Sequence, residues 1–316
     1  MSLQNKVIII FICIISIVLF LLIVSPYSRN EGLRAAFDAE FLSRPDGYKG
    51  LKKHYGLEFG NPPLQMDPGL MYRALASGAV DVIDAFATDG RIPAYGLKVL
   101  EDDKKFFPPY YAVPVVKEQI LDDYPEIKEV LSLITNQIDD STIQHLNFLA
   151  DEKGRKAENI ARDFLLGREL IHPLHKKPNY GDAAFTVGGK HFTEQEIIGE
   201  IIVLLLERKM QITIQRKLNL GGTMICFNAL RSGDVDLYVE YTGTGLLNIL
   251  NRENIRDADK TYRIVKKVFK EKYHLIWLDP LGFNNTYTLT MRKDHAQELE
   301  ISTISDLSDY LAGHKQ

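Results

Sequence analysis

Cysteine is scarce in this sequence, which has only Cys13 and Cys226 among its 316 residues. Cys13 lies within a long apolar run, so we expect no disulfide between the two and no disulfide-stapled framework. The charges nearly balance, at a net −4, and this gives no support to the basic face that nucleic-acid binding requires. We therefore expect no nucleic-acid partner.

Recognisable catalytic motifs are missing as well. The sequence has no G-x-S-x-G elbow, no phosphate-binding P-loop and no H-E-x-x-H metal motif. His172 and His175 have a metal-like spacing without acidic or cysteine neighbours, and we interpret them as solvated histidines. The sequence therefore predicts a protein that is not an enzyme and holds neither a cofactor nor a metal.

A long apolar run, Val7–Val24, carries no charge. As a helix it would be roughly 27 Å long, close to the hydrocarbon thickness of a bilayer. The apolar part of a secretory signal is usually shorter and ends at a small-x-small cleavage site, which is missing here. We predict that residues 1–30 form a single-pass membrane anchor, with a cleaved signal as the alternative. Lys6 favours an inside start, which places the rest on the periplasmic or extracellular side.

A repeat organises the remainder of the chain. Arg73–Gly90 and Asn228–Gly245 share a helix end, a Ser-Gly turn, a strand and a closing aromatic, which is Phe86 in one copy and Tyr241 in the other. Copies this far apart are not a solenoid, and we interpret them as two similar lobes. Ligands of open α/β sheets bind at the carboxyl ends of strands, so facing lobes would place both rings in one cleft.

Helical and strand patterns alternate along the chain. Apolar periodicity, proline and capping residues predict helices at 48–55, 68–76, 124–135, 141–149, 157–166, 197–206, 260–273 and 304–310. Strands are predicted at 80–86, 110–116, 184–187, 211–218, 275–279 and 284–291. This alternation favours α/β lobes with mainly parallel sheets. Thr193 and Glu196 match a capping box ahead of the helix at 197–206, and Ser141 is the expected N-cap of the helix at 141–149.

Eight motifs together carry a family resemblance. They are GGKHFTEQ, KLNLGGT, EYTGTG, GFNNTY, RPDG, MDPGLMY, TDGRI and FFPPYYAVPVV. The set resembles the osmoprotectant-binding proteins of ABC importers, which capture glycine betaine, carnitine or choline. The resemblance covers nearly everything from Gly32 to Gln316 and implies a two-lobed periplasmic-binding-protein fold of type II.

The motifs stand in a different order from that of the family. In the family the G-x-K-x-F-T-E segment opens the protein and FFPPYY lies near its end, whereas here the later part comes first. This resembles a circular permutation in which a linker at 168–183 joins the old ends, a change that proteins tolerate when their termini meet at the surface. The alternative is a fusion of two half-proteins, each completed by a partner chain. Permutation is favoured because the two parts make one copy with little missing or duplicated.

This order also predicts the domain boundaries. Lobe B should run from 31 to 107 and be completed by 291–316, and lobe A should run from 108 to 290.

The resemblance implies a box of aromatic rings made by Tyr241, Tyr287, Phe86 and Tyr110. A quaternary ammonium group donates no hydrogen bond, but ring faces attract it by about 0.5–2 kcal/mol each. Phe86 departs from the family, which mostly has tyrosine there, and keeps the ring face while losing the hydroxyl. The alternative for each ring is a place in the core, and Tyr111 remains an alternative to Tyr110.

A betaine also carries a carboxylate, for which the resemblance implies Arg44, Lys190 and the hydroxyl of Thr244, with Asn285 as a further contact. The alternatives are that Arg44 braces its own turn and that Lys190 is a solvated loop charge. Without a ligand anion, the two cations would be buried unpaired, which is costly. On this reasoning we expect glycine betaine to be preferred over choline.

The function that the resemblance implies is capture of a betaine-type osmolyte by hinge closure outside the membrane. The ligand would then pass to a separate ABC permease and ATPase. The alternatives are a membrane-anchored osmolyte-sensing domain and a remnant that binds nothing.

Overall fold

The structure is a computed structural model that describes residues 32–173 and 181–313. The predicted anchor at 1–30 and part of the predicted linker therefore lie outside the described residues. Within the described ranges, no helix has both the length and the apolar character needed to cross a membrane.

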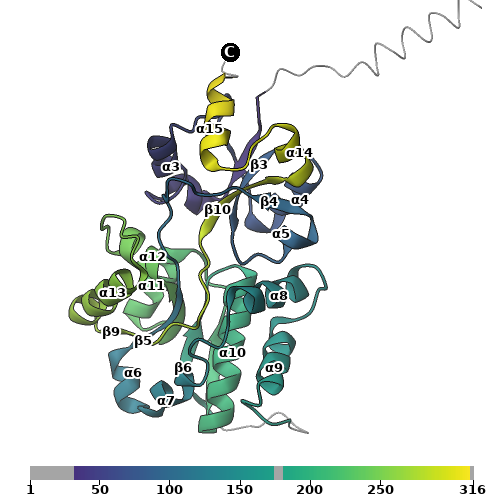
Figure 1. Ribbon diagram of the computed structural model, residues 1–316. Helices are drawn as coiled ribbons and strands as arrows, with labels where there is room; N and C mark the ends of the chain where they lie inside the picture. The colour runs from purple at the N-terminus through teal and green to yellow at the C-terminus, as the bar shows by residue number, and fades with distance from the viewer. Residues whose placement is uncertain (1–31, 174–180, 314–316) are drawn as a thin grey trace, which may run out of the picture.

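The chain forms two α/β lobes stacked end to end and joined by two crossing segments (Figure 1). The sheet of lobe B has the strand order β2-β1-β3-β10-β4, with bounds Leu64–Gln65, Ala35–Phe37, Val82–Phe86, Tyr287–Arg292 and Leu97–Val99. The sheet of lobe A has the order β7-β6-β8-β5-β9, with bounds Thr213–Lys217, Ala183–Gly188, Leu237–Tyr241, Ala112–Lys117 and Leu275–Trp277. The two-lobed architecture is the one that the sequence predicts.

Both sheets are mixed, where we expected mainly parallel ones. In lobe B, β1 pairs in parallel with β2 and β3, but β10 runs antiparallel to β3 and β4. In lobe A, β6 pairs in parallel with β7 and β8, but β5 runs antiparallel to β8 and β9. The physical reason is that each sheet takes one strand from the segment arriving from the other lobe.

Helices cover the sheets largely where periodicity predicts them. Lobe B has α2 (Ala39–Ser43), α3 (Tyr48–Tyr55), α4 (Pro68–Ala76), α5 (Arg91–Ala94), α14 (Lys293–Glu298) and α15 (Ile304–Gly313). Lobe A has α6 (Glu118–Asp123), α7 (Glu126–Ser132), α8 (Asp140–Asp151), α9 (Ala157–Gly167), α10 (Thr193–Met210), α11 (Thr223–Ser232), α12 (Thr242–Thr244), a π-helical turn (Gly245–Ile249) and α13 (Ala258–Tyr273).

The start of α10 corrects the predicted capping box. The N-cap residue is Phe192, and it makes no side-chain capping bond. The hydroxyl of Thr193 instead donates to Asp151 on α8, at 2.6 Å. A tertiary partner therefore replaces the local one that the sequence pattern predicts.

The internal repeat is confirmed as a repeat of structure. α4 leads into β3 through Gly78 at φ +75°, and α11 leads into β8 through Gly233 at φ +86°, a left-handed conformation that suits glycine. Each strand is the middle strand of its five-stranded sheet and ends on an aromatic residue, Phe86 in β3 and Tyr241 in β8. The two lobes thus present equivalent strand ends to each other.

The crossing strands bring two further aromatics to these ends. Tyr287 opens β10 and pairs with Phe86, while Ala112 on β5 pairs with Tyr241, two residues after Tyr110. The chain therefore rejoins the sheet of lobe B at Tyr287, slightly before the boundary near 291 that we expected.

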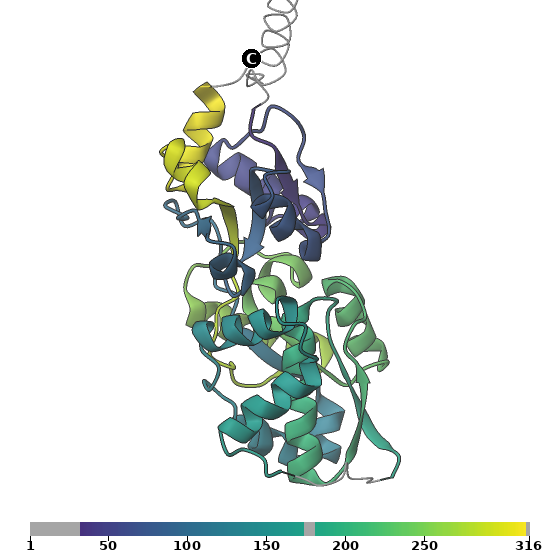
Figure 2. The same cartoon turned by 90° about the vertical axis from the view of Figure 1, so that its right-hand side faces the viewer.

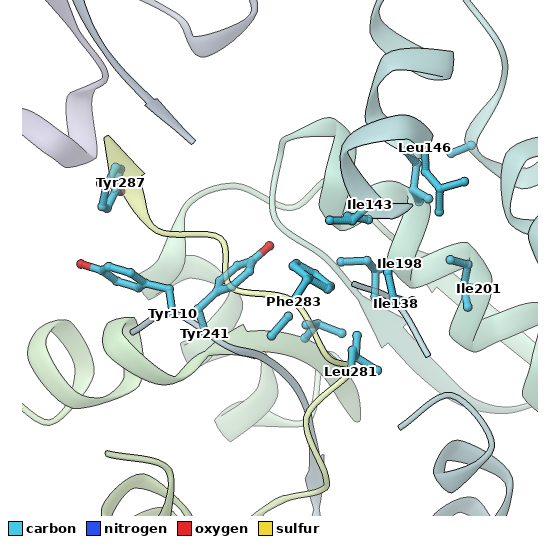
Figure 3. Close-up of a cluster of buried hydrophobic side chains, with 14 of the residues drawn as sticks. Tyr110, Ile138, Ile143, Leu146, Ile198, Ile201, Tyr241, Leu281, Phe283 and Tyr287 are labelled. Carbon is cyan, nitrogen blue, oxygen red and sulfur yellow. The ribbon is translucent and has the colours of Figure 1, made fainter. Parts of the chain in front are cut away.

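Gly282 lies on the segment that leads from lobe A towards β10, between Leu281 and Phe283, two buried core residues that Figure 3 labels. Its φ is +123°, and a Cβ there would lie 2.9 Å from the Cα of Asn136 and 2.9 Å from the carbonyl oxygen of Ile138. Backbone strain and a clash with main-chain atoms would act together. We expect Gly282→Ala to lower the free energy of unfolding by about 2–4 kcal/mol.

Urea unfolding would measure this loss. Gly60→Ala is the control, because a Cβ at Gly60 meets no atom within 4 Å, and it should change stability little. Equal stability of the two variants would contradict the close packing at Gly282.

Candidate ligand-binding site

A cavity of about 50 Å³ lies between the lobes, where the carboxyl ends of β3 and β8 face each other. This is several times the ~10–15 Å³ that a single water needs. All eight residues singled out in the sequence line it: Arg44, Phe86, Tyr110, Lys190, Tyr241, Thr244, Asn285 and Tyr287. The structure thus brings together side chains from opposite ends of the sequence, and it does so from both lobes.

Aromatic rings form much of the cavity wall. The ring centre of Tyr287 lies 5.3 Å from that of Phe86 and 5.7 Å from that of Tyr110, which meets it edge-on at 89°. Figure 3 shows Tyr110, Tyr241 and Tyr287 grouped beside the apolar core of lobe A, on the left of the view. All three tyrosines are buried, although the cavity gives their faces an open side.

Phe192 is a further ring that the sequence reasoning left unassigned. It stacks on Phe86 with ring centres 5.7 Å apart and planes 5° apart. It also faces Tyr241 at 6.4 Å and 24°. Its place in the GGKHFTEQ motif, two residues after Lys190, was a signal that it points towards the same site.

Arg44 already has a buried partner. Its Nε and Nη2 donate to the two carboxylate oxygens of Asp46 at 2.9 and 2.5 Å, and the hydroxyl of Tyr110 donates to Asp46 at 2.6 Å. Nη2 also donates to Thr244 Oγ1 at 3.1 Å, across the two lobes. The guanidinium lies 5.4 Å from the ring centre of Tyr287. Arg44 therefore does brace its turn, and it also reaches the cavity.

Lys190 is paired in the same way. Its Nζ donates to the fully buried Glu240 at 2.6 Å and to Thr223 Oγ1 at 3.1 Å, and it lies 5.1 Å from the ring centre of Tyr241. The premise that Arg44 and Lys190 would be unpaired without a ligand anion is therefore wrong. Each has a carboxylate from its own lobe, which neutralises the buried cation without a ligand.

Hydrogen bonds across the cleft hold the lobes together. Glu40 of lobe B accepts from the backbone N–H of Thr223 at 2.7 Å and from its hydroxyl at 3.1 Å, at the first turn of α11. Thr88 of lobe B donates to Glu194 of lobe A at 2.5 Å. Together with the contact between Arg44 and Thr244, these bonds describe a closed arrangement.

The pKa values of the site carboxyls follow their partners. Burial raises the pKa of Asp46, but Arg44 and the hydroxyl of Tyr110 outweigh it, so the net shift is downward. Burial likewise raises the pKa of Glu40, but Lys190 and Arg44 lower it overall. Burial raises the pKa of Glu194, and its four hydrogen-bond donors offset only part of this rise. Asp46 and Glu40 are therefore anions in the folded protein at neutral pH.

The cavity is lined by rings, by two acidic side chains, Asp38 and Glu40, and by two cations that are each paired with a further carboxylate. This arrangement suits a bulky, weakly hydrated cation. Asn285 lines the same cavity and donates through Nδ2 to Glu194 at 2.8 Å. In the part of the chain that the structure describes, no group of three or more His, Cys, Asp or Glu side chains could hold a metal ion.

Comparison with known proteins gives a family match. The family model described as "Substrate binding domain of ABC-type glycine betaine transport system" matches residues 25–166 and 184–315. Similar proteins include the carnitine transport binding protein OpuCC of Listeria monocytogenes, 42% identical over 43% of this chain and 44% of that protein. The glycine-betaine-binding protein of Pseudomonas aeruginosa is 39% identical over 43% of this chain and 44% of its own length.

A solved structure described as a glycine betaine/carnitine/choline ABC transporter shares 39% identity over 45% of this chain and 52% of that chain, with a TM-score of 0.36. The chain spans less than half the length of the curated relatives that it matches.

The pair of Arg44 and Asp46 generates a prediction about pH. Asp46→Asn should cost roughly 3–5 kcal/mol of stability at pH 7, because it leaves a buried guanidinium without its anion. The folded-state pKa of Asp46 is lowered, so its contribution is fully present above the unfolded pKa near 3.8. It is lost as the pH falls further, since the unfolded chain takes up the proton first.

Urea unfolding of both proteins from pH 7 to pH 3 would therefore show a gap that is constant above pH 5 and narrows below pH 4. A gap that stays unchanged down to pH 3 would contradict the ion pair.

Proposed function

The chain belongs to the family of substrate-binding domains of ABC-type glycine betaine transport systems, and from this premise we propose that it captures a quaternary ammonium osmolyte outside the cytoplasm. The observation that carries the proposal is the aromatic wall of the cavity, built by Phe86, Tyr110, Tyr241 and Tyr287 from both lobes. Such a wall offers several ring faces to one cation, each contributing about 0.5–2 kcal/mol when water is excluded.

Capture would work by closing the lobes around the ligand. Two rings end equivalent strands on opposite lobes, so the box is complete only when the lobes meet. Glu40, Arg44 and Thr88 each bond across the cleft and would stabilise the closed state. The captured osmolyte would pass to an ABC permease and ATPase.

The polar residues would hold the ligand's other end. We assign Arg44, Lys190 and Thr244 to the carboxylate of a betaine, with Asn285 beside them. Because Asp46 and Glu240 already neutralise the two cations, the carboxylate would join existing ion pairs. Binding choline, which has no carboxylate, would therefore not leave either cation unpaired. We expect a smaller preference for glycine betaine over choline than unpaired cations would give.

Two observations support the permuted order as part of this proposal. The family match falls in two segments, separated at 167–183, where the linker is predicted. The two ends of the described chain lie side by side at the far end of lobe B (Figures 1 and 2).

We also retain the N-terminal anchor as part of the proposal. Its support is the uncharged run Val7–Val24, which is long enough to span a bilayer as a helix. The anchor would keep the two lobes at the outer surface, near the permease.

Tyr287 tests the role of the rings, because its proposed contribution comes from the ring face and not from the hydroxyl. Tyr287→Leu removes the ring face while keeping an apolar side chain, and it should weaken glycine betaine or choline by roughly 1–3 kcal/mol. Tyr287→Phe is the matched control, which keeps the ring and should bind nearly as the wild type does. Calorimetry measures both. Equal affinity in all three proteins would remove Tyr287 from the site.

The permutation is tested by restoring the family order. A chain that starts near Ala184 and runs through Gln316 into residues 32–170 should fold as a monomer and bind the same ligand with similar affinity. Size-exclusion chromatography and calorimetry measure the two properties. If the natural chain proves to be an obligate dimer with exchanged lobes, the single-chain interpretation is wrong.

A further inference from the structure

A second cavity, of about 140 Å³, adjoins the first. The two share Pro68, Phe86, His191, Phe192 and Asn285 as a common wall. The rest of the second cavity is mostly polar and comes from both lobes: Asp67, Gly69, Thr88, Asp89 and Arg91 from lobe B, and Asn147, Asp151, Thr193 and Glu194 from lobe A. A ligand held among the rings would therefore have a polar space next to it.

Glu194 organises the polar wall. Its Oε2 accepts from the hydroxyl of Thr88 at 2.5 Å and from Asn147 Nδ2 at 3.1 Å. Its Oε1 accepts from the hydroxyl of Tyr241 at 2.7 Å and from Asn285 Nδ2 at 2.8 Å. The carboxylate thus fixes both asparagine amides with their nitrogens turned towards it.

The two amide oxygens are left without donors. Among the described residues, Oδ1 of Asn147 and Oδ1 of Asn285 are buried and have no hydrogen-bond partner. The side chains are almost fully enclosed, with 4% and 6% of each residue exposed. Exchanging oxygen and nitrogen does not help, because it would set each oxygen against the carboxylate of Glu194. Buried acceptors of this kind call for a donor.

The charges around the cavity decide what kind of donor fits. The cation Arg91 is already bound by Asp89, at 2.9 and 2.6 Å, and lies 3.7 Å from Asp151. Glu194 already accepts four hydrogen bonds. The wall therefore presents acceptors and carboxylates, which would repel the carboxylate of a ligand. A neutral or positively charged hydrogen-bond donor fits this wall.

We propose that the second cavity is a subsite for a hydroxyl group of the ligand, which donates its one proton to the amide oxygen of Asn147, while the quaternary ammonium group lies among the rings. The chain would then favour hydroxylated quaternary ammonium compounds over otherwise identical compounds without the hydroxyl. This inference rests on the proposed function, because it places the head of the same ligand in the first cavity.

Two pairs of ligands isolate the hydroxyl. Choline differs from ethyltrimethylammonium only by that group, and carnitine differs from 4-trimethylammoniobutanoate in the same way. For the wild type we expect the hydroxyl to tighten binding about five- to tenfold in at least one pair, as measured by calorimetry. Asn147→Leu should reduce this advantage to less than about twofold, while the affinity for the hydroxyl-free member stays close to that of the wild type.

Gln144→Leu is the matched control. Gln144 lies on the same helix and its amide reaches the same interface, at 3.4 Å from the carbonyl oxygen of Ala87, but it lines neither cavity. This variant should keep the full hydroxyl advantage. Retained binding of the hydroxyl-free ligands shows that each variant is folded.

Two results would overturn the inference. One is that the wild type binds both members of each pair with equal affinity, so that the hydroxyl contributes nothing. This result comes from the wild type alone. The other is a hydroxyl advantage that survives Asn147→Leu. Failure of the proposed function itself would look different, because no hydroxyl-free quaternary ammonium compound would then bind at all.

Discussion

Neutralisation of buried charge is the constraint on which the rest of the site depends. Arg44 and Lys190 lie in a cleft that excludes water, where an unpaired cation would cost several kcal/mol. Each cation is neutralised by a carboxylate of its own lobe. Arg44 Nη2 lies 2.5 Å from Asp46 Oδ2, and Lys190 Nζ lies 2.6 Å from Glu240 Oε1. The cleft can therefore close around a ligand of either kind, with or without a carboxylate, and closure itself does not expose an unsatisfied cation.

Buried carboxylates, Asp46 and Glu194, also hold the rings of the aromatic wall. Asp46 accepts from the hydroxyl of Tyr110 as well as from Arg44, so the ion pair and the ring share one anchor. Glu194 does the same for Tyr241. The hydrogen bonds from their hydroxyls thus fix the orientation of both rings. A site prepared in this way loses little side-chain freedom when it binds.

Local patterns predicted much of the fold, and the failures have physical causes. The predicted start of the helix at 68 is correct, because Pro68 is the first residue of α4 and Asp67 is its N-cap. The strands β1, β2 and β4 went unpredicted because each has only two or three residues, too few for an alternation to show. Ser141 was expected to cap α8, but Asp139 does so and holds the hydroxyl of Ser141 as well. Neighbouring polar residues compete for such roles, and the sequence does not rank them.

The candidate site divides along the same line. Eight of the residues that line the cavity were identified from the sequence, seven because each stands in a recognisable motif and Phe86 because it closes one copy of the repeat. The carboxylate partners of Arg44 and Lys190 were not predicted, although both stand in the same motifs. Asp46 lies in the Arg-Pro-Asp-Gly turn, and Glu240 directly precedes Tyr241. Proximity in sequence does not say which way a side chain turns, and a charge that faces inward is identified only when its partner is located.

This distinction changes what selectivity must depend on. A bare cation in the cleft would select for a carboxylate by charge alone, and the sequence reasoning began from that view. With Arg44 and Lys190 already neutralised, charge discriminates less, and the shape of the ring wall and the unfilled acceptors beside it discriminate more. Because a site built to hydrogen-bond a particular group penalises ligands that lack it, a buried amide oxygen such as that of Asn147 can contribute more to selectivity than two cations that neighbouring carboxylates already neutralise.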